Sequence, residues 1–351
     1  MQVLSLWVNK NSAHANRNDW PMTTVKNPHD LLAAVPFLIG YHPTDSLVLI
    51  SVKEDALEMA MRIDFPRNPE EGTYQVLATH LKRDGAEAAL AIVYEPAECD
   101  SGETILQNLA DAISNLEIPI RELMLVRNGR WRSLICSDLT CCPLEGTPIS
   151  DFQNSRIAAE QVANGKVLPF ADAEGLSNSI APLEIAGDLN WSSKISNFRI
   201  EQDDPELNAK QRDGAEAILL LADFYIQNGF SDDADLKARV LGRLTDIQVR
   251  DYALGCHSAE TLEGYAKMWR ELLRIAPPKF VAPVASLFAA ITYENGEGAL
   301  AHRALDRAIE DDPEYSLSRL LRRVFSSGWP PSGFAQLRSE LHPRVTQTIF
   351  G

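Results

Sequence analysis

The fold of the N-terminal half is decided by residues 47–65, LVLISVKEDALEMAMRIDF. The first part, Leu47–Val52, is a continuous apolar run, which is typical of a strand buried on both faces. From Leu57 to Phe65 every second residue is a large apolar one, which predicts a second strand with one face toward solvent. Only residues 53–56 separate the two, a length that suits a hairpin connection. The segment therefore predicts two antiparallel strands.

Further helices and strands are predicted on both sides of this hairpin. Before it, Asn27 and Pro28 form a helix-start signal, and Gly40 ends that helix. After it, strands are expected at 88–94, 123–126 and 131–136, and helices at about 70–83 and 105–116, the second capped by Ser101. Asn128-Gly129 is a type I′ hairpin signal between the last two strands. This order predicts an α/β domain with a mixed sheet of about five strands and helices packed on it.

The connections also predict the strand directions. Each passage from strand 57–65 to 88–94 and on to 123–126 contains a helix, so these three strands should run parallel. The loop at residues 41–45 then lies at the end where the parallel strands finish. The strand after Asn128-Gly129 runs back, so Cys136 emerges at the opposite end of the sheet.

Four segments are expected along the chain. Residues 1–26 are predicted to be a poorly ordered N-terminal extension that adds nothing to the fold, and residues 27–165 form the α/β domain. A Ser150-x-x-Gln153 capping box is expected to open a helix that closes at Asn164-Gly165. Residues 166–205, rich in Pro, Gly, Ser and Asp, are interpreted as an inter-domain connection, and residues 206–351 as an all-α helical domain.

Composition narrows the function classes. The formal net charge of −16 repels phosphate backbones, so neither nucleic acid nor a membrane is expected as a partner. No apolar run approaches the roughly 20 residues that span a bilayer, and no secretion signal is recognised. Five cysteines without a regular framework are typical of reduced thiols. We therefore expect a cytoplasmic protein, and no sequence motif calls for a cofactor.

The helical half contains one unit that resembles a tetratricopeptide helical hairpin. Small, turn and proline residues stand at that motif's positions: Ala289, Gly296, Ala301, Leu305, Ala308 and Pro313. A single unit does not make a solenoid, so an ordinary hairpin in a compact bundle is the alternative. Either arrangement leaves the helical half as the candidate surface for a protein partner.

Several short motifs together resemble one bacterial family. They are DLLAAVPFLIGYHPTDSLVL at 30–49, RDGA at 83–86, GRWRS at 129–133, CCP at 141–143 and DPEYSL at 312–317. Together these resemble the domain of unknown function 4192 family over nearly the whole chain from Met22 onward. The resemblance supports the architecture and implies no activity. The segment before Met22 departs from the pattern and is interpreted as a start-site extension.

The first candidate site is the polar loop that leads into strand 47–52. His42, Asp45 and Ser46 could serve as acid, base or ligand to a small molecule, and Arg127 would add positive charge at the same end of the sheet. The loops with Glu95 and Asp100 are expected there as well. The alternative is a tight turn in which the His and Asp side chains bond only to the backbone.

The second candidate site contains the thiols Cys136, Cys141 and Cys142 and the carboxylate of Asp138, after the fifth strand. Thiolates together could hold zinc or form a redox pair. The paired C-x-x-C knuckles of zinc sites are missing, and adjacent cysteines rarely bind one tetrahedral ion together. We therefore expect free thiols and no metal.

Three functions follow from these observations. The favoured one is a non-enzymatic binding or regulatory protein that uses its helical half for protein contacts, because the common catalytic signatures are absent from the sequence. The first alternative is a small-molecule enzyme or ligand-binding domain that uses the His42–Ser46 loop. The second is a thiol-redox or metal site at Cys136–Cys142. Sequence alone does not decide whether the protein is an enzyme.

Overall fold

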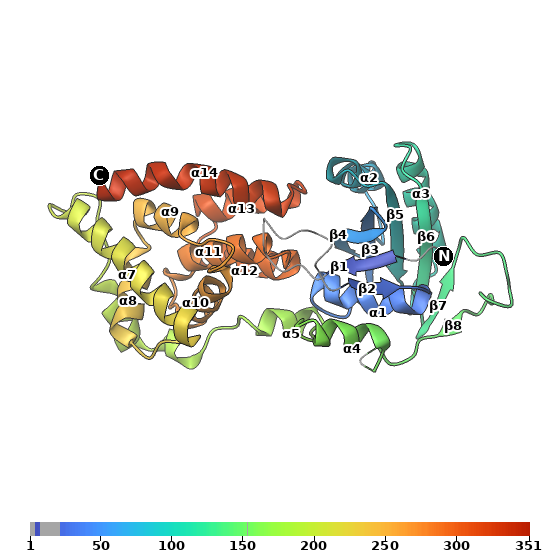
Figure 1. Cartoon of the computed structure of the whole chain (residues 1–351), viewed down its shortest axis with the longest axis horizontal. Helices are drawn as coiled ribbons and strands as arrows, with labels where there is room; N and C mark the ends of the chain where they lie inside the picture. The colour runs from blue at the N-terminus through green and yellow to red at the C-terminus, as the bar shows by residue number, and fades with distance from the viewer. Residues whose placement is uncertain (1–3, 8–21, 153) are drawn as a thin grey trace. The chain divides into compact units, whose positions relative to one another are not determined.

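A computed structural model describes residues 4–7, 22–152 and 154–351 (Figure 1). These divide into two compact units. The first contains the described residues up to Leu176, and the second runs from Ser177 to Gly351. The first is built on a mixed β-sheet with helices and the second is helical, which confirms the predicted α/β half and all-α half.

The described part of the first unit contains one eight-stranded sheet in the order β2-β1-β4-β3-β5-β6-β7-β8. The strands are β1 (Leu4–Trp7), β2 (Met22–Val25), β3 (Ser46–Lys53), β4 (Ala56–Asp64), β5 (Ala88–Tyr94), β6 (Ile120–Arg127), β7 (Arg130–Ser133) and β8 (Thr147–Pro148). The five predicted strands are all present, as β3 to β7. The sheet is larger than expected because β1, β2 and β8 extend its two edges.

The strand directions are those predicted from the connections. β3 is antiparallel to both of its neighbours, β4 and β5, and β5 is parallel to β6, so β4, β5 and β6 run in one direction. In the register, Ser46 pairs with Asp64 and with Tyr94, and Tyr94 pairs with Val126. The loop before β3 therefore lies where the three parallel strands end.

Helices cover the sheet on both sides. Helices α2 (Thr73–Asp84) and α3 (Gly102–Ser114) pack against each other and against β3, β5 and β6, and they share an apolar core with alternate residues of those strands. Helices α1 (Pro28–Ile39) and α4 (Arg156–Ala163) pack together and contact β2, and α1 also contacts β4. Figure 1 shows α1 on the opposite side of the sheet from α2 and α3. This arrangement explains why β3 and β5 are apolar on both faces.

The helix-start and helix-end residues predicted for α1, and the turn residues predicted for the Asn128-Gly129 hairpin, adopt the expected conformations. The Asn27 side chain accepts a hydrogen bond from the Asp30 amide at 2.8 Å, and α1 ends at Gly40 with φ of 87°. Asn128 and Gly129 have φ of 50° and 70°, as the type I′ turn requires. Helix α2 begins at Thr73, later than Asn68-Pro69 suggested, after Gly72 in a left-handed conformation.

The N-terminal segment differs from the expectation of an extension outside the fold. β2 lies within residues 1–26, and β1 pairs antiparallel with β2 and parallel with β4. β1 covers the beginning of the edge of β4, where Ser5 and Leu6 pair with Ala56 and Leu57. The rest of the predicted extension, residues 1–3 and 8–21, lies outside the described residues.

The second unit consists of helices from its first residues onward. They are α6 (Leu189–Ser196), α7 (Leu207–Asn228), α8 (Ala234–Arg243), α9 (Ile247–Gly255), α10 (Leu262–Ile275), α11 (Val281–Glu294), α12 (Gly298–Asp311), α13 (Ser316–Ser326) and α14 (Pro331–Phe350), with the short 3₁₀ helix η2 (Glu184–Gly187) before α6. Helix α5 (Ala173–Asn178) spans the division between the units. None of the helices in the described ranges is long and apolar enough to cross a membrane.

The segment expected to connect two domains belongs largely to this helical core. Trp191 and Ile195 of α6 are buried in the core cluster, and the Trp191 indole donates a hydrogen bond to the Ile275 carbonyl at 2.8 Å. The division between the units therefore falls after Leu176, and not across residues 166–205. The polar composition of this segment concealed a helix whose Trp191 and Ile195 are buried, although Leu189 at its start is exposed.

Helix α11 lies at the centre of the helical core. All of its residues are buried, and α9, α10, α12, α13 and α14 contact it. Gly296, with φ of 79°, makes the predicted turn into α12, where Ala301 and Ala308 are fully buried and let the helices approach closely. In the tetratricopeptide-like hairpin, α11 is thus covered on every side, whereas α12 buries only one face.

A buried ionic network joins the last helix to this core. Arg338 of α14 donates from Nε to Glu294 Oε1 at 2.7 Å, and from Nη1 to the carbonyls of Gly255 and His257 at 3.1 Å each. His257 Nε2 lies 2.9 Å from Glu294 Oε2. The side chains of His257 and Glu294 are each 3% exposed and that of Arg338 is 9% exposed. The network therefore anchors α14 through charges that water does not reach.

Candidate functional site

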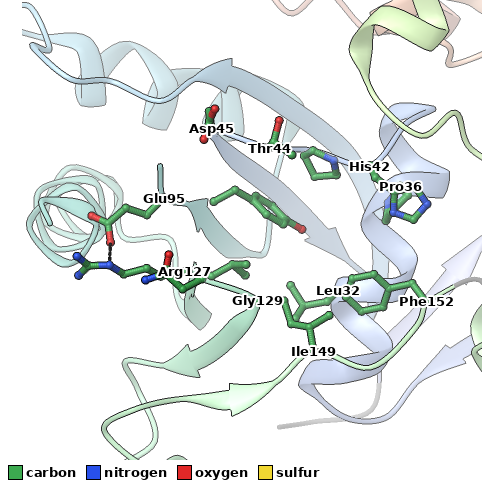
Figure 2. A pocket seen from close by; sticks show the side chains of 14 residues that line it. Leu32, Pro36, His42, Thr44, Asp45, Glu95, Arg127, Gly129, Ile149 and Phe152 are labelled. Atoms are coloured by element: carbon green, nitrogen blue, oxygen red, sulfur yellow. Dashed lines mark ion pairs between the residues drawn. The ribbon is translucent and has the colours of Figure 1, made fainter. Parts of the chain in front are cut away.

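A pocket of about 260 Å³ lies at the carboxyl ends of the parallel strands (Figure 2). Five chain segments contribute to it: α1, the loop before β3, the ends of β5 and β6, and the segment after β8. The lining residues are Leu32, Pro36, His42, Pro43, Thr44, Asp45, Tyr94, Glu95, Val126, Arg127, Asn128, Gly129, Ile149 and Phe152. This is the end of the sheet at which the topology predicted a small-molecule site.

Glu95 lies on the polar side of the pocket and forms its central ionic contact. It follows β5 directly, and its side chain is only 1% exposed. Oε1 accepts a hydrogen bond from the Gly102 amide, the first of α3, at 2.7 Å, and Oε2 lies 3.5 Å from Arg127 Nε. Ser101, the expected cap of α3, makes no side-chain capping bond. The acid of the preceding strand therefore caps the helix, where its charge is favourable.

Arg127 extends from this buried carboxylate toward solvent. It ends β6, and its side chain is 42% exposed. Its Nε faces Glu95, while its terminal nitrogens have no hydrogen-bond acceptor among the residues that the structure describes. Figure 2 shows this ion pair on the side of the pocket opposite Leu32, Ile149 and Phe152. The pocket thus has a charged side, where Arg127 is paired with Glu95, and an apolar side.

His42 and Phe152 form part of the apolar side. Their rings stack at a centroid distance of 6.4 Å and an angle of 13°, and both also line a smaller adjacent cavity. The His42 amide donates to the Phe170 carbonyl at 3.0 Å, which fixes the loop. Burial lowers the pKa of His42, and the charge of Asp151 offsets this only in part. The imidazole is therefore neutral near pH 7.

The segment that carries Phe152 is held by a second histidine. His29 of α1 is hydrogen-bonded to the Ser150 hydroxyl, and its ring contacts Phe152 at 5.5 Å between centroids. Ser150 therefore does not open a helix. Helix α4 begins at Arg156, where the Ser155 hydroxyl accepts from the Ala158 amide at 3.1 Å, and the other half of the predicted capping box, Gln153, lies outside the described residues.

The predicted site residues are only partly brought together. His42, Asp45 and Arg127 line the pocket, whereas Ser46 does not. Asp45 is exposed with φ of 42°, and its carbonyl accepts from the Phe65 amide at 2.8 Å. Ser46 is fully buried, and its hydroxyl has no hydrogen-bond partner among the described residues. Because no hydrogen bond joins the His, Asp and Ser side chains in that part of the chain, they do not form a proton relay.

Several lining residues were not predicted from the sequence. Tyr94 and Phe152 contribute rings, and burial raises the pKa of the Tyr94 hydroxyl. Asp100, expected near the site, is not in the lining. Tyr94 could have been found because it ends a predicted parallel strand, where lining residues are expected. Phe152 follows a two-residue strand and carries no comparable signal.

The three candidate cysteines gather at the other end of the sheet. The sulfur atoms of Cys136, Cys141 and Cys142 all lie within 4.8 Å of one another in the connection from β7 to β8. Cys142 is buried, Cys136 is half-buried and Cys141 is exposed, and all three are free thiols. Burial, reinforced by the other two sulfur atoms, raises the pKa of Cys142 to about 11. The His42 loop and the cysteines are separate, as the topology predicted.

Comparison with known proteins identifies a family without assigning an activity. No curated protein and no solved structure gives a match to this chain. One family model matches residues 28–332, from the first residue of α1 into the beginning of α14, and its description is a domain of unknown function, DUF4192. The match covers both units and agrees with the resemblance seen in the sequence motifs. The chain therefore belongs to the DUF4192 family.

Proposed function

We propose that the α/β unit binds a small organic anion with an apolar body in the pocket at the carboxyl ends of β4, β5 and β6. The observation that carries this proposal is the lining, which places an arginine on one side and aromatic and aliphatic side chains on the other. Open α/β sheets most often bind ligands at this end. A volume of about 260 Å³ is a little below that of pockets for drug-sized ligands and suits a small molecule.

The anionic group of the ligand is assigned to Arg127. The charge of Glu95 is already offset by the Gly102 amide at the start of α3 and by Arg127 Nε. The terminal nitrogens of the guanidinium remain as donors, and their planar fork matches a carboxylate or a phosphate. On a chain with a net charge of −16, such an arginine is a specific attraction and not part of a basic surface.

The apolar body is assigned to the side formed by Leu32, Ile149 and Phe152. Leu32 is almost fully buried in α1, and Phe152 is held by its contacts with His29 and His42. A rigid, prepared surface reduces the entropy lost on binding. The neutral ring of His42 can donate or accept one hydrogen bond to the ligand without adding charge.

A thermal-shift screen of small aliphatic and aromatic carboxylates and phosphomonoesters tests this function. We expect at least one class to raise the melting temperature, with the affinity then measured by calorimetry. Arg127→Met should weaken binding by about tenfold or more, because it removes a charge-assisted bond worth about 1.5–3 kcal/mol. Phe152→Ala should weaken binding of compounds with larger apolar bodies most.

Arg121→Met is the matched control for this screen. Arg121 lies on the same strand, β6, but pairs with Asp55 at 2.6 Å and is not in the pocket lining. The Arg121→Met substitution should therefore leave the ligand affinity unchanged. Equal affinity in the Arg127→Met and Arg121→Met proteins, or no stabilising compound in either anion class, would contradict the proposal.

A second candidate function is a protein contact through the helical unit. Leu220 and Phe224 stand one turn apart on α7 and are exposed, with Leu219 and Ile226 beside them. Exposed apolar side chains at helical spacing fit the apolar face of a partner helix. A protein that cross-links to the intact chain, but not to a Leu220→Glu, Phe224→Glu double variant, would support this. Loss of the same cross-link in a Val76→Glu control, in the other unit, would argue against it.

We also propose a cytoplasmic location. All five cysteines are free thiols, which is usual in a reducing compartment. Fractionation of the source cells with antibodies to the chain tests this, and recovery in a secreted or membrane fraction would contradict it.

A further inference from the structure

We propose that Cys136, Cys141 and Cys142 together bind one thiophilic metal ion, for which Zn²⁺ is the probe. The sequence argued against a metal because two of the cysteines are adjacent and no C-x-x-C pair occurs. The structure shows a proximity that the spacing in the sequence does not reveal: all three sulfur atoms lie within 4.8 Å of one another. No other group of three or more possible ligands is found among the described residues.

The distances suit a common centre. With zinc–sulfur bonds of about 2.3 Å, two sulfur atoms on one tetrahedral ion are about 3.8 Å apart. The cysteine sulfurs therefore need to approach one another by no more than about 1 Å, which rotation of the side chains provides. Thiolates are the ligands that soft and borderline cations prefer. Binding releases the thiol protons to solvent, and no electron transfer is involved.

A backbone turn explains how adjacent cysteines can face Cys136. The Asp138 carbonyl accepts hydrogen bonds from the amides of Cys141 at 3.2 Å and Cys142 at 2.8 Å. The Asp138 carboxylate accepts from both the amide and the hydroxyl of Thr140, at 2.8 and 2.7 Å. These bonds fold residues 138–142 back toward the end of β7, so that the chain prepares the three positions before any ion binds.

The other side of the cluster is anchored to the sheet. The Cys136 amide donates to the Ser133 hydroxyl at 3.2 Å, and that hydroxyl donates to Glu122 Oε1 at 2.6 Å. Ser133 and Glu122 are both buried on β7 and β6. Two of the ligands thus come from a turn and one from a position tied to the sheet.

The fourth coordination position would face solvent. Cys142 is buried while Cys141 is exposed, so an ion held by the three sulfurs keeps one side open. Three protein ligands with an open position leave room for water or for an exogenous donor. The site lies at the opposite end of the sheet from the pocket, so it does not depend on the proposed anion binding.

Metal loading of the purified, fully reduced chain tests the proposal. The protein is exposed to Zn²⁺, separated from free ion by gel filtration, and analysed for bound metal. Loading with Co²⁺ gives a second readout, because thiolate coordination produces a charge-transfer absorption. We expect about one equivalent of either ion in the wild-type chain. Cys136→Ser and Cys141→Ser should each lose most of it.

Matched controls and a folding check complete the experiment. Cys99→Ser and Cys256→Ser remove thiols outside the cluster and should retain the metal. Circular dichroism confirms that each variant is folded, and Cys141, being exposed, is the variant least able to disturb the fold. A wild-type chain with all five thiols titratable that retains no metal would overturn the proposal. Equal retention by the Cys141→Ser and Cys99→Ser proteins would overturn it as well.

Discussion

Replacing Arg338 by Met should destabilise the helical unit strongly. The substitution keeps the apolar stem and removes the guanidinium that neutralises Glu294. Glu294 would stay buried with only His257 as a partner, and the carbonyls of Gly255 and His257 would lose their donor. Removing one member of a buried ion pair costs about 3–5 kcal/mol, because the remaining charge is uncompensated. We expect a loss of that size.

Hydrogen exchange measured by mass spectrometry can follow this loss within the helical unit. Peptides from α11 report the free energy of opening, and the first unit serves as an internal reference. Arg344→Met, an exposed position on the same helix, should change the free energy by no more than about 0.5 kcal/mol. Adding Glu294→Gln to the Arg338→Met protein should restore part of the loss. A loss below about 1 kcal/mol in the Arg338→Met protein would refute the reasoning.

Three further predictions concern the sheet and acid stability. Ser46→Ala should leave stability unchanged or raise it by up to about 1 kcal/mol in a urea titration, because it removes a buried hydroxyl that has no partner. Gly102→Ala should cost about 1–3 kcal/mol in the same titration, since its Cβ would lie 2.6 Å from the Leu125 side chain. Burial lowers the pKa of His257, and for Glu294 the bonds to its partners outweigh burial and also lower the pKa. Both groups bind fewer protons when folded, so thermal melts should show the helical unit losing stability as the pH falls below about 6.5; constant stability down to pH 5 would contradict this.

The strand topology was predictable because it depends on connection type more than on exact boundaries. The short link between 47–52 and 57–65, the helices in the next two links and the Asn128-Gly129 turn determine the direction of every strand from β3 to β7. Strand direction in turn determines which loops share an end. The sequence therefore placed His42, Asp45 and Arg127 together with no knowledge of distance.

The details of the pocket were not predictable because they depend on individual side-chain contacts, which no periodic pattern records. Glu95 displaces Ser101 as the cap of α3, since its carboxylate reaches the Gly102 amide from the neighbouring strand. Phe152 enters the pocket because His29, far away in the sequence, bonds to Ser150. Neither contact leaves a periodic pattern in the chain.

The same reason explains the ends of the sheet and the cysteines. β1 is four residues long and pairs with β4 through its backbone, so its short sequence carried no strand signal. The cysteine sulfurs approach one another through a turn at Asp138 whose hydrogen bonds a spacing rule does not include.

The complete burial of α11 has a consequence for the order in which the chain is made. During synthesis, α11 leaves the ribosome before α12, α13 and α14, which cover it. Until then part of its apolar surface is uncovered. Its last residue, Glu294, lacks its ion-pair partner Arg338, which follows 44 residues later in the chain. Domains fold as units as they emerge, and apolar surface exposed in the meantime is prone to aggregation. The helical unit therefore exposes apolar surface during synthesis until its last helices, α12, α13 and α14, have been released.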